Sequence, residues 1–202
     1  MTITPDPPVA PFEPDVPGVR HTMLDLAETV YQHMPGCRAE IINGTLVVNP
    51  LPDATHARCL TDLLLALPHE TGGAVAVHGL GLWLSTGEHD HVVPDLSVVD
   101  EDFTEHEVTY NCLPASAFRM VAEITSANPT YETVVKSLAY AGAGVPVYLI
   151  GDRTQREAVL LTEPLEGSYR RRAVYRPGES FMLPESVGAE VEIDVDTLLG
   201  RS

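Results

Sequence analysis

A short apolar strand, a helical segment and a second apolar strand follow one another in the second half of the chain. The first strand is expected over Phe118–Ser126, helical periodicity runs over Thr130–Ala143, and GVPVYLIGD (144–152) forms the next buried strand. Such a succession predicts two parallel strands joined by a right-handed crossover. The chain is therefore expected to fold as an α/β protein.

Two helices and a hairpin are expected before this unit. Helical spacing marks His21–Met34, where Thr22 is a candidate N-cap, and Pro52–Leu67, which Asp53 can cap. Between them Asn43-Gly44 separates two β-prone runs and favours positive φ, so it predicts a tight hairpin turn.

Interrupted β-prone runs account for most of the remaining chain. Residues 74–84 are broken by Gly79 and Gly81, and residues 91–100 are broken by Pro94, which predicts a bend or a sheet edge. The tail is expected to form three more strands, at AVLLTEP, SYRRRAVY and ESFML, and a short helical turn at DVDTLLG.

Length and composition suit one folded domain. The chain has 202 residues and 44% hydrophobic residues, and no apolar run approaches the roughly 20 residues that span a bilayer. We expect residues 1–18 to be a disordered Pro-rich head without a secretory signal, and residues 19–202 to be a single domain. Three widely spaced cysteines argue against a disulfide framework, and together these features predict a cytoplasmic protein.

The formal net charge of −17 weighs against nucleic acid as a partner, because affinity for phosphates usually comes from clustered Lys and Arg. Arg170, Arg171, Arg172 and Arg176 do lie together in one late segment. A solvated strand face is the simpler interpretation of that cluster.

Glu123 is an acid in an otherwise apolar strand. Alternation places it on one face with Val121 and Thr125, while Ala122 and Ile124 face the other way. A buried carboxylate needs a metal, a base or hydrogen bonds beside it, so Glu123 is a candidate site residue. The alternative is a Glu at an exposed strand end.

Asp95 and Lys136 are two further candidates. Asp95 begins the run LSVV and could project from a strand end, where two carboxylates can bind Mg²⁺ and support phosphoryl chemistry. Lys136 is the only basic residue between Arg119 and Arg153, and in a helix it shares a face with Glu132 and Tyr140. A lysine there can assist an attacking water, although a surface pair with Glu132 is an equal alternative.

A metal site at His89, Asp90 and His91 is less favoured. Imidazole and carboxylate groups suit zinc, but alternating histidines in a polar turn more often form a solvated loop.

Several of these segments, taken in order, resemble the Uma-two family of restriction endonuclease-like proteins, within the PD-(D/E)XK nuclease superfamily. They are AEIINGTLVVNPLPDATH, VVPDLSVVD, VAEITS, the helix with Lys136 and Tyr140, and AGAGVPVYLIGD. The resemblance covers about residues 38–152. No single piece is specific, but the ordered set is.

The resemblance implies a restriction-endonuclease-like mixed sheet flanked by helices. It also implies that Asp95 and Glu123 bind a metal, that Lys136 is the catalytic lysine and that Glu40 is a further acidic ligand. Thr125 stands where the (D/E)XK signature has its lysine, which the family supplies from the next helix. His56 matches a family position, and Tyr140 lies on the helix of Lys136, so these two residues and Thr125 are further site candidates.

The leading expectation is an endonuclease that uses Mg²⁺ or Mn²⁺ to hydrolyse phosphodiester bonds in DNA. A homodimer is expected by analogy with single-domain nucleases of this fold. The alternative is a non-catalytic protein that keeps the fold as an interaction or dimerisation scaffold, as the negative charge and the displaced lysine suggest. Convergence of Lys136 with the acids would favour the enzyme.

Overall fold

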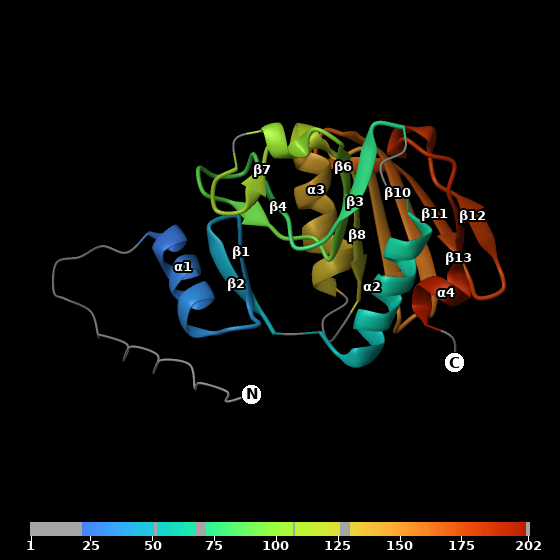
Figure 1. The fold of residues 1–202 in the computed structure, drawn as a ribbon, viewed down its shortest axis with the longest axis horizontal. Helices are drawn as coiled ribbons and strands as arrows, with labels where there is room; N and C mark the ends of the chain where they lie inside the picture. Colours follow the sequence, from blue (N-terminus) through green and yellow to red (C-terminus); the bar gives the residue numbers. More distant parts are fainter. Residues whose placement is uncertain (1–21, 51, 68–71, 107, 126–129, 201–202) are drawn as a thin grey trace, which may run out of the picture.

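The computed structural model describes residues 22–50, 52–67, 72–106, 108–125 and 130–200 (Figure 1). The predicted head, residues 1–18, lies outside these ranges, as does Ser126 at the end of the predicted strand. The division into a head and a single domain therefore stays a prediction. Within the described ranges, no helix has both the length and the apolar character needed to cross a membrane.

The central sheet has six strands in the order β11-β10-β9-β8-β6-β3. Strands β8 and β9 pair in parallel, as the strand–helix–strand pattern predicted, and the other neighbours are antiparallel. This confirms the mixed sheet. The strands are β3 (Ala74–Val77), β6 (Leu96–Asp100), β8 (Phe118–Ile124), β9 (Val147–Asp152), β10 (Glu157–Leu165) and β11 (Ser168–Tyr175).

A second sheet of five short strands has the order β2-β1-β5-β4-β7. Its first two strands form the predicted hairpin, with Asn43 at φ 51° and Gly44 at φ 68° in the turn. A two-stranded sheet near the C-terminus completes the strands. The strands of these two sheets are β1 (Arg38–Ile42), β2 (Thr45–Asn49), β4 (Gly81–Trp83), β5 (His91–Val92), β7 (Cys112–Leu113), β12 (Ser180–Met182) and β13 (Glu192–Asp194).

The chain passes between the two large sheets where glycine and proline interrupt the predicted strands. Strand β3 belongs to the central sheet and β4 to the second sheet, and Gly79 lies between them at φ 72°. Pro94 likewise lies between β5 and β6, which are in different sheets. The second of these passages brings Asp95 to the start of β6, next to β8.

Helices cover both faces of the central sheet, as predicted. Helix α2 (Ala54–Ala66) and the short α4 (Val195–Leu199) pack on one face, where Cys59, Leu63 and Leu198 join the core with Met120 and Ile124 of β8. The described chain begins at α1 (Met23–His33), which lies on β1 of the second sheet (Figure 1). It ends directly after α4.

Two predicted helix caps are confirmed. The Thr22 side chain accepts from the Asp25 amide, and the Asp25 carboxylate accepts in return from the Thr22 amide at 2.7 Å. The Asp53 side chain accepts from the amide of His56 at 2.8 Å and begins α2. These bonds satisfy amides that the helix itself leaves without partners.

The other face of the central sheet is covered by a helix of mixed geometry. The sequence predicted regular helix over Thr130–Ala143, but the segment Tyr131–Lys136 is a π-helix (η3) and only Ser137–Ala143 (α3) is α-helical. Tyr140 of α3 is fully buried between the sheets and packs edge-on against Tyr148 of β9. Short π segments often accompany functional sites, because they shift one side chain relative to its neighbours.

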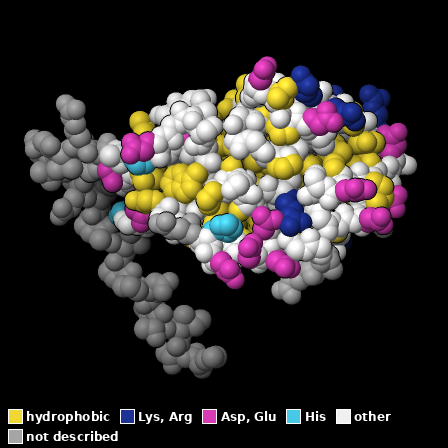
Figure 2. All heavy atoms as spheres, turned by 90° about the horizontal axis from the view of Figure 1, so that it is seen from above, with side chains coloured by type: hydrophobic (Ala, Val, Ile, Leu, Met, Phe, Trp, Pro, Cys, Tyr) yellow, Lys and Arg dark blue, Asp and Glu magenta, His cyan; other side chains and the backbone are white. Residues whose placement is uncertain are grey.

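The basic cluster on β11 and directly after it has the predicted solvated character. Arg170, Arg171, Arg172 and Arg176 are exposed, and Arg171 pairs with Glu163 at 2.8 Å across the hairpin. In the view of Figure 2, Lys and Arg side chains are few and lie mainly toward the end away from the grey residues, while acidic side chains are spread over the face. The three cysteines are free thiols, in agreement with the predicted absence of disulfides.

Candidate active site

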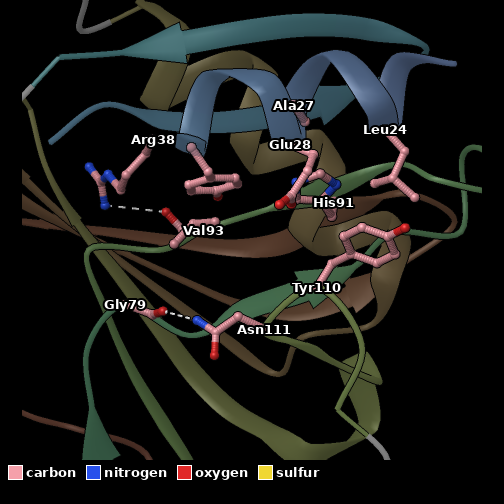
Figure 3. A pocket seen from close by; sticks show the side chains of 10 residues that line it. Leu24, Ala27, Glu28, Arg38, Gly79, His91, Val93, Tyr110 and Asn111 are labelled. Atoms are coloured by element: carbon pink, nitrogen blue, oxygen red, sulfur yellow. Dashed lines mark hydrogen bonds between the residues drawn. The ribbon is translucent and has the colours of Figure 1, made fainter. Parts of the chain in front are cut away.

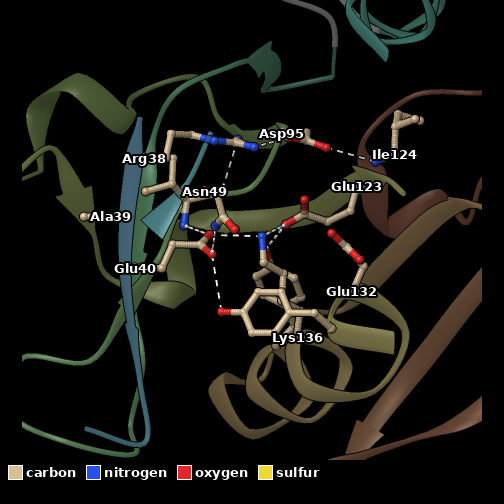
Figure 4. A network of polar contacts seen from close by, with 12 residues as sticks. Arg38, Ala39, Glu40, Asn49, Asp95, Glu123, Ile124, Glu132 and Lys136 are labelled. Atoms are coloured by element: carbon tan, nitrogen blue, oxygen red, sulfur yellow. Dashed lines mark hydrogen bonds and ion pairs between the residues drawn. The ribbon is translucent and has the colours of Figure 1, made fainter. Parts of the chain in front are cut away.

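Four elements bring the predicted site residues together between the two large sheets (Figure 4). Glu123 projects from β8 toward the helix side, on the face shared with Val121, and Lys136 comes from the end of η3. Glu40 projects from β1, where alternation turns Ala39 and Ile41 toward α1 and leaves Glu40 on the inner face. Asp95 lies at the start of β6.

Lys136 is buried in contact with two carboxylates. Its Nζ lies 2.7 Å from Glu123 Oε1 and 3.0 Å from Glu40 Oε1, and its side chain is only 3% exposed. Burial acts to lower the pKa of Lys136, but the charges of Glu123 and Glu40 outweigh burial and raise its pKa. The lysine is therefore held as a cation, and the surface pair with Glu132 weighed from the sequence is not its arrangement.

Glu123 is a fully buried acid, as its apolar strand suggested. Oε1 accepts from Lys136 and, at 2.6 Å, from the hydroxyl of Tyr140 one helical turn further on. Burial raises the pKa of Glu123, and the nearby Asp95 and Glu40 carboxylates act in the same direction, against Lys136. A further positive charge, in addition to Lys136, would act against this shift.

Asp95 has protein donors on both oxygens. Oδ1 accepts from Arg38 Nη2 at 2.7 Å, and Oδ2 accepts from His56 Nε2 at 2.9 Å and from the Ile124 amide at 3.0 Å. Burial acts to raise the pKa of Asp95, but the hydrogen bond from His56 and the charge of Arg38 hold it well below its usual range. Asp95 is thus an anion in a buried setting.

His56 contributes through Asp95. A carboxylate only accepts hydrogen bonds, so the proton of the imidazole lies on Nε2, and the buried Nδ1 has no hydrogen-bond partner. His56 is 2% exposed on the first turn of α2, where the Asp53 cap fixes the helix end. The arrangement orients the Asp95 carboxylate rather than exposing the imidazole.

Glu40 and Thr125 are held by the protein in different ways. Glu40 Oε1 accepts from the Val93 amide at 2.9 Å as well as from Lys136, and Oε2 accepts from Asn49 Nδ2 at 2.7 Å. Thr125 is buried, and its Oγ1 accepts from the Arg153 amide at 3.0 Å, which ties the end of β8 to the end of β9. This hydrogen bond of Thr125 does not involve Lys136.

A cavity of about 230 Å³ opens beside these groups. Asp95, Glu123, Lys136 and Arg38 line it, together with Glu132, whose buried Oε2 has no hydrogen-bond partner. Burial is the main cause that raises the pKa of Glu132. The carboxyl groups of Glu123 and Glu132 lie near each other in Figure 4.

The donor set is suited to a divalent cation. Four carboxyl groups, those of Glu40, Asp95, Glu123 and Glu132, stand against the two cations Arg38 and Lys136, which leaves two formal negative charges. Asp53, which also lines the cavity, pairs with Arg153 outside it and adds no net charge. Carboxylate oxygens are the ligands that Mg²⁺ and Mn²⁺ prefer. Glu132 Oε2 accepts no hydrogen bond and is therefore available as a metal ligand. Across the described ranges, no three His, Cys, Asp or Glu side chains are already gathered around one point for an ion.

Sequence reasoning missed several residues of this network. Arg38, Asn49 and Tyr131 each contact a predicted acid, and Tyr131 also lies with its ring centre 5.7 Å from Lys136 Nζ. None has a local signal, because a strand-end Arg or Asn and a helical Tyr are ordinary residues. The scarcity of basic residues, which drew attention to Lys136, could have drawn attention to Arg38 as well.

The less favoured zinc candidate has structural roles instead. Asp90 accepts from the Gly44 amide at 3.1 Å and from the Thr86 hydroxyl at 2.6 Å, so it joins the β1–β2 turn to the β4–β5 loop. The His91 ring packs edge-on against Trp83, with ring centres 5.6 Å apart.

Comparisons with known proteins agree with this architecture. The sequence model of the Uma2 family, described as "Putative restriction endonuclease", matches residues 27–196. A crystal structure described as that of "a putative nuclease belonging to DUF820" from Anabaena variabilis has a similar fold, with a TM-score of 0.67 and 19% identity. The similarity covers 89% of this chain and 98% of that one. No curated protein matches the chain significantly.

The family match spans most of the chain and includes every element that supplies the candidate site, from β1 to α3. The similar crystal structure independently supports the mixed sheet with helices on both faces. The chain therefore belongs to the Uma2 family of restriction endonuclease-like proteins.

Proposed function

We propose that the chain is an endonuclease that hydrolyses phosphodiester bonds of DNA with Mg²⁺, for which Mn²⁺ can substitute. The observation that carries the proposal is the buried Lys136 ammonium held by Glu123 and Glu40 at the wall of an acidic cavity. Burying so many charges costs free energy, so a purely structural role gives a poor account of the arrangement.

Asp95 and Glu123 are the proposed metal ligands, and Glu132 fits as a third because its Oε2 lacks a partner. When bound, Mg²⁺ stabilises charge that develops on a phosphoryl group and makes water a better nucleophile. Glu40, predicted as a ligand, does not line this cavity and accepts from Lys136, the Val93 amide and Asn49, so its proposed contribution to the metal site is to hold Lys136.

Lys136 acts in this proposal as a fixed positive charge. Its raised pKa keeps the ammonium protonated, which suits stabilisation of negative charge on a phosphate oxygen better than removal of a proton from water. Glu40 positions the lysine directly, and Tyr140 positions it through Glu123. His56 and Arg38 position Asp95. Thr125 has no chemical role in the proposal.

The strong negative charge of the chain does not prevent local binding of DNA. Charges beyond a Debye length of about 8 Å are largely screened at physiological salt. A divalent cation would offset the excess charge of the cavity itself.

A homodimer and a cytoplasmic location remain predictions. Light scattering of the purified protein can test whether it is a homodimer.

Calorimetric titration with Mg²⁺ and Mn²⁺, combined with a plasmid-nicking assay, tests the proposal. The wild type is expected to bind the metal and nick the plasmid. Asp95→Asn with Glu123→Gln keeps the volumes and many of the hydrogen bonds but removes both charges. This double variant should lose both metal binding and plasmid nicking. Asp90→Asn, which changes a buried carboxylate outside the cavity, is the matched control and should keep both.

A folded wild-type protein that binds neither metal would refute the metal-dependent nuclease. That outcome would favour the non-catalytic scaffold, the alternative suggested by the sequence. Nicking that survives in the double variant would instead show that the reaction occurs elsewhere on the chain.

A further inference from the structure

A second cavity, of about 380 Å³, lies on the other side of Arg38 and has no part in the proposed chemistry. Helix α1 forms one wall, and the segment before β7 forms the opposite wall (Figure 3). Figure 3 shows Leu24 and Glu28 reaching from α1 toward Tyr110 and Asn111, with His91 between the two walls. The cavity is large enough for a flat heterocycle.

Arg38 connects this cavity to the candidate active site. It lines both cavities, and it also lines a third, of about 310 Å³, which includes Asp95 and Gly79. Gly79 in turn lines the cavity under α1, so this cavity and the third share both Arg38 and Gly79, and all three share Arg38. A polymer with a phosphate beside Asp95 and Lys136 could extend along this path.

The walls of the cavity under α1 combine aromatic rings with polar groups. Tyr110 is 56% exposed and Tyr31 is 45% exposed, although exposed aromatic rings of this size are costly in water. Tyr110 packs edge-on against Trp83, with ring centres 6.3 Å apart, which holds the outer ring in place. Asn111 Nδ2 donates to the Gly79 carbonyl at 2.6 Å, so the amide oxygen is available as an acceptor.

We propose that this cavity binds one unpaired nucleobase of the strand whose phosphate lies in the cavity of Lys136. The inference rests on the proposed nuclease function and extends it to the class of substrate. A ring can stack on Tyr110, its polar edge can reach Asn111 and Glu28, and its phosphate lies on the side of Arg38. A base in a closed duplex cannot enter, so the site requires a single strand or an extruded base.

Binding of a labelled twelve-nucleotide single strand, followed by fluorescence anisotropy, tests this site. Ca²⁺ replaces Mg²⁺ so that the strand stays intact, which a gel verifies. Tyr110→Ala is expected to weaken binding roughly 5- to 150-fold, the range found when an aromatic ring that stacks on a base is truncated. Tyr110→Phe keeps the ring and should bind like the wild type.

Two controls separate base recognition from other effects. A strand with abasic sugars at its central positions should bind the wild type and Tyr110→Ala equally. Met182→Ala removes a side chain of similar exposure on β12, outside the cavity, and should change nothing. Quenching of a 2-aminopurine base in the strand on addition of wild-type protein gives a second readout that does not depend on how well Tyr110→Ala folds.

The proposal is overturned if the wild type binds neither strand, if it shows no preference for the strand with bases, or if Tyr110→Ala weakens both strands equally. Plasmid nicking without any base preference would refute this site and leave the nuclease intact. Base preference without nicking would refute the nuclease and leave a single-strand binding site.

Discussion

Replacement of Lys136 by methionine tests whether the site is held by buried charge. Methionine keeps most of the volume but removes the ammonium that lies 2.7 Å from Glu123 and 3.0 Å from Glu40. These two carboxylates are at most 2% exposed, so solvent compensates poorly for the lost partner. Removal of one member of a buried ion pair typically costs about 3–5 kcal/mol. We expect a loss of that size in the free energy of unfolding without metal.

Urea unfolding followed by circular dichroism measures the effect. With a slope of about 2 kcal/mol per molar, the midpoint should fall by roughly 1.5–2.5 M. Lys136→Met combined with Glu123→Gln should cost less than the sum of the two single changes, because the second removes the charge that the first leaves unpaired. Additive costs, or a loss below about 1 kcal/mol for Lys136→Met, would refute the reasoning.

Three further predictions concern other groups of the site and core. Tyr140→Phe removes a donor to a buried carboxylate and should lower the unfolding free energy by about 1.5–3 kcal/mol in the same assay, and an unchanged value would contradict the described hydrogen bond. Because the folded pKa of Asp95 lies below its unfolded value of about 4, its carboxylate stabilises the fold above that pH and the contribution is lost on acidification. Asp95→Asn should therefore flatten the fall of the urea midpoint below pH 4, and an unaltered fall would exclude this role. Half-buried Cys37 should react with a thiol reagent before Cys59 and Cys112, because the latter two are buried and burial raises the pKa of Cys112 to about 12. Rapid reaction of all three thiols in the folded protein would contradict this prediction.

Much of the fold could be predicted because its signals are local. The Asn43-Gly44 turn, the Asp53 cap and the alternation around Glu123 each depend on a few adjacent residues, and each is present as predicted. The glycine and proline breaks were equally clear in the sequence. Their consequence, the transfer of the chain between two sheets, depends on which strands pair far along the chain, and no local pattern specifies that.

The site was predictable where its chemistry is unusual for its surroundings. An acid in an apolar strand and a lone lysine stand out, and the structure brings Glu123 and Lys136 into contact. Arg38 did not stand out, because its importance comes from meeting Asp95 across 57 positions of the chain. The role of Lys136 as a fixed cation, rather than a base, likewise follows only from its two buried neighbours.

The π-helix that ends at Lys136 makes the site sensitive to spacing. A π turn holds about one residue more than an α turn, so Tyr131–Lys136 contains a residue that regular helix would not accommodate in the same length. Loss of one residue there would let the segment become α-helical and rotate Tyr131 and Glu132 by about 100° relative to Lys136 and Tyr140. The network should therefore tolerate exchanges of side chain in this segment more readily than any change in its length.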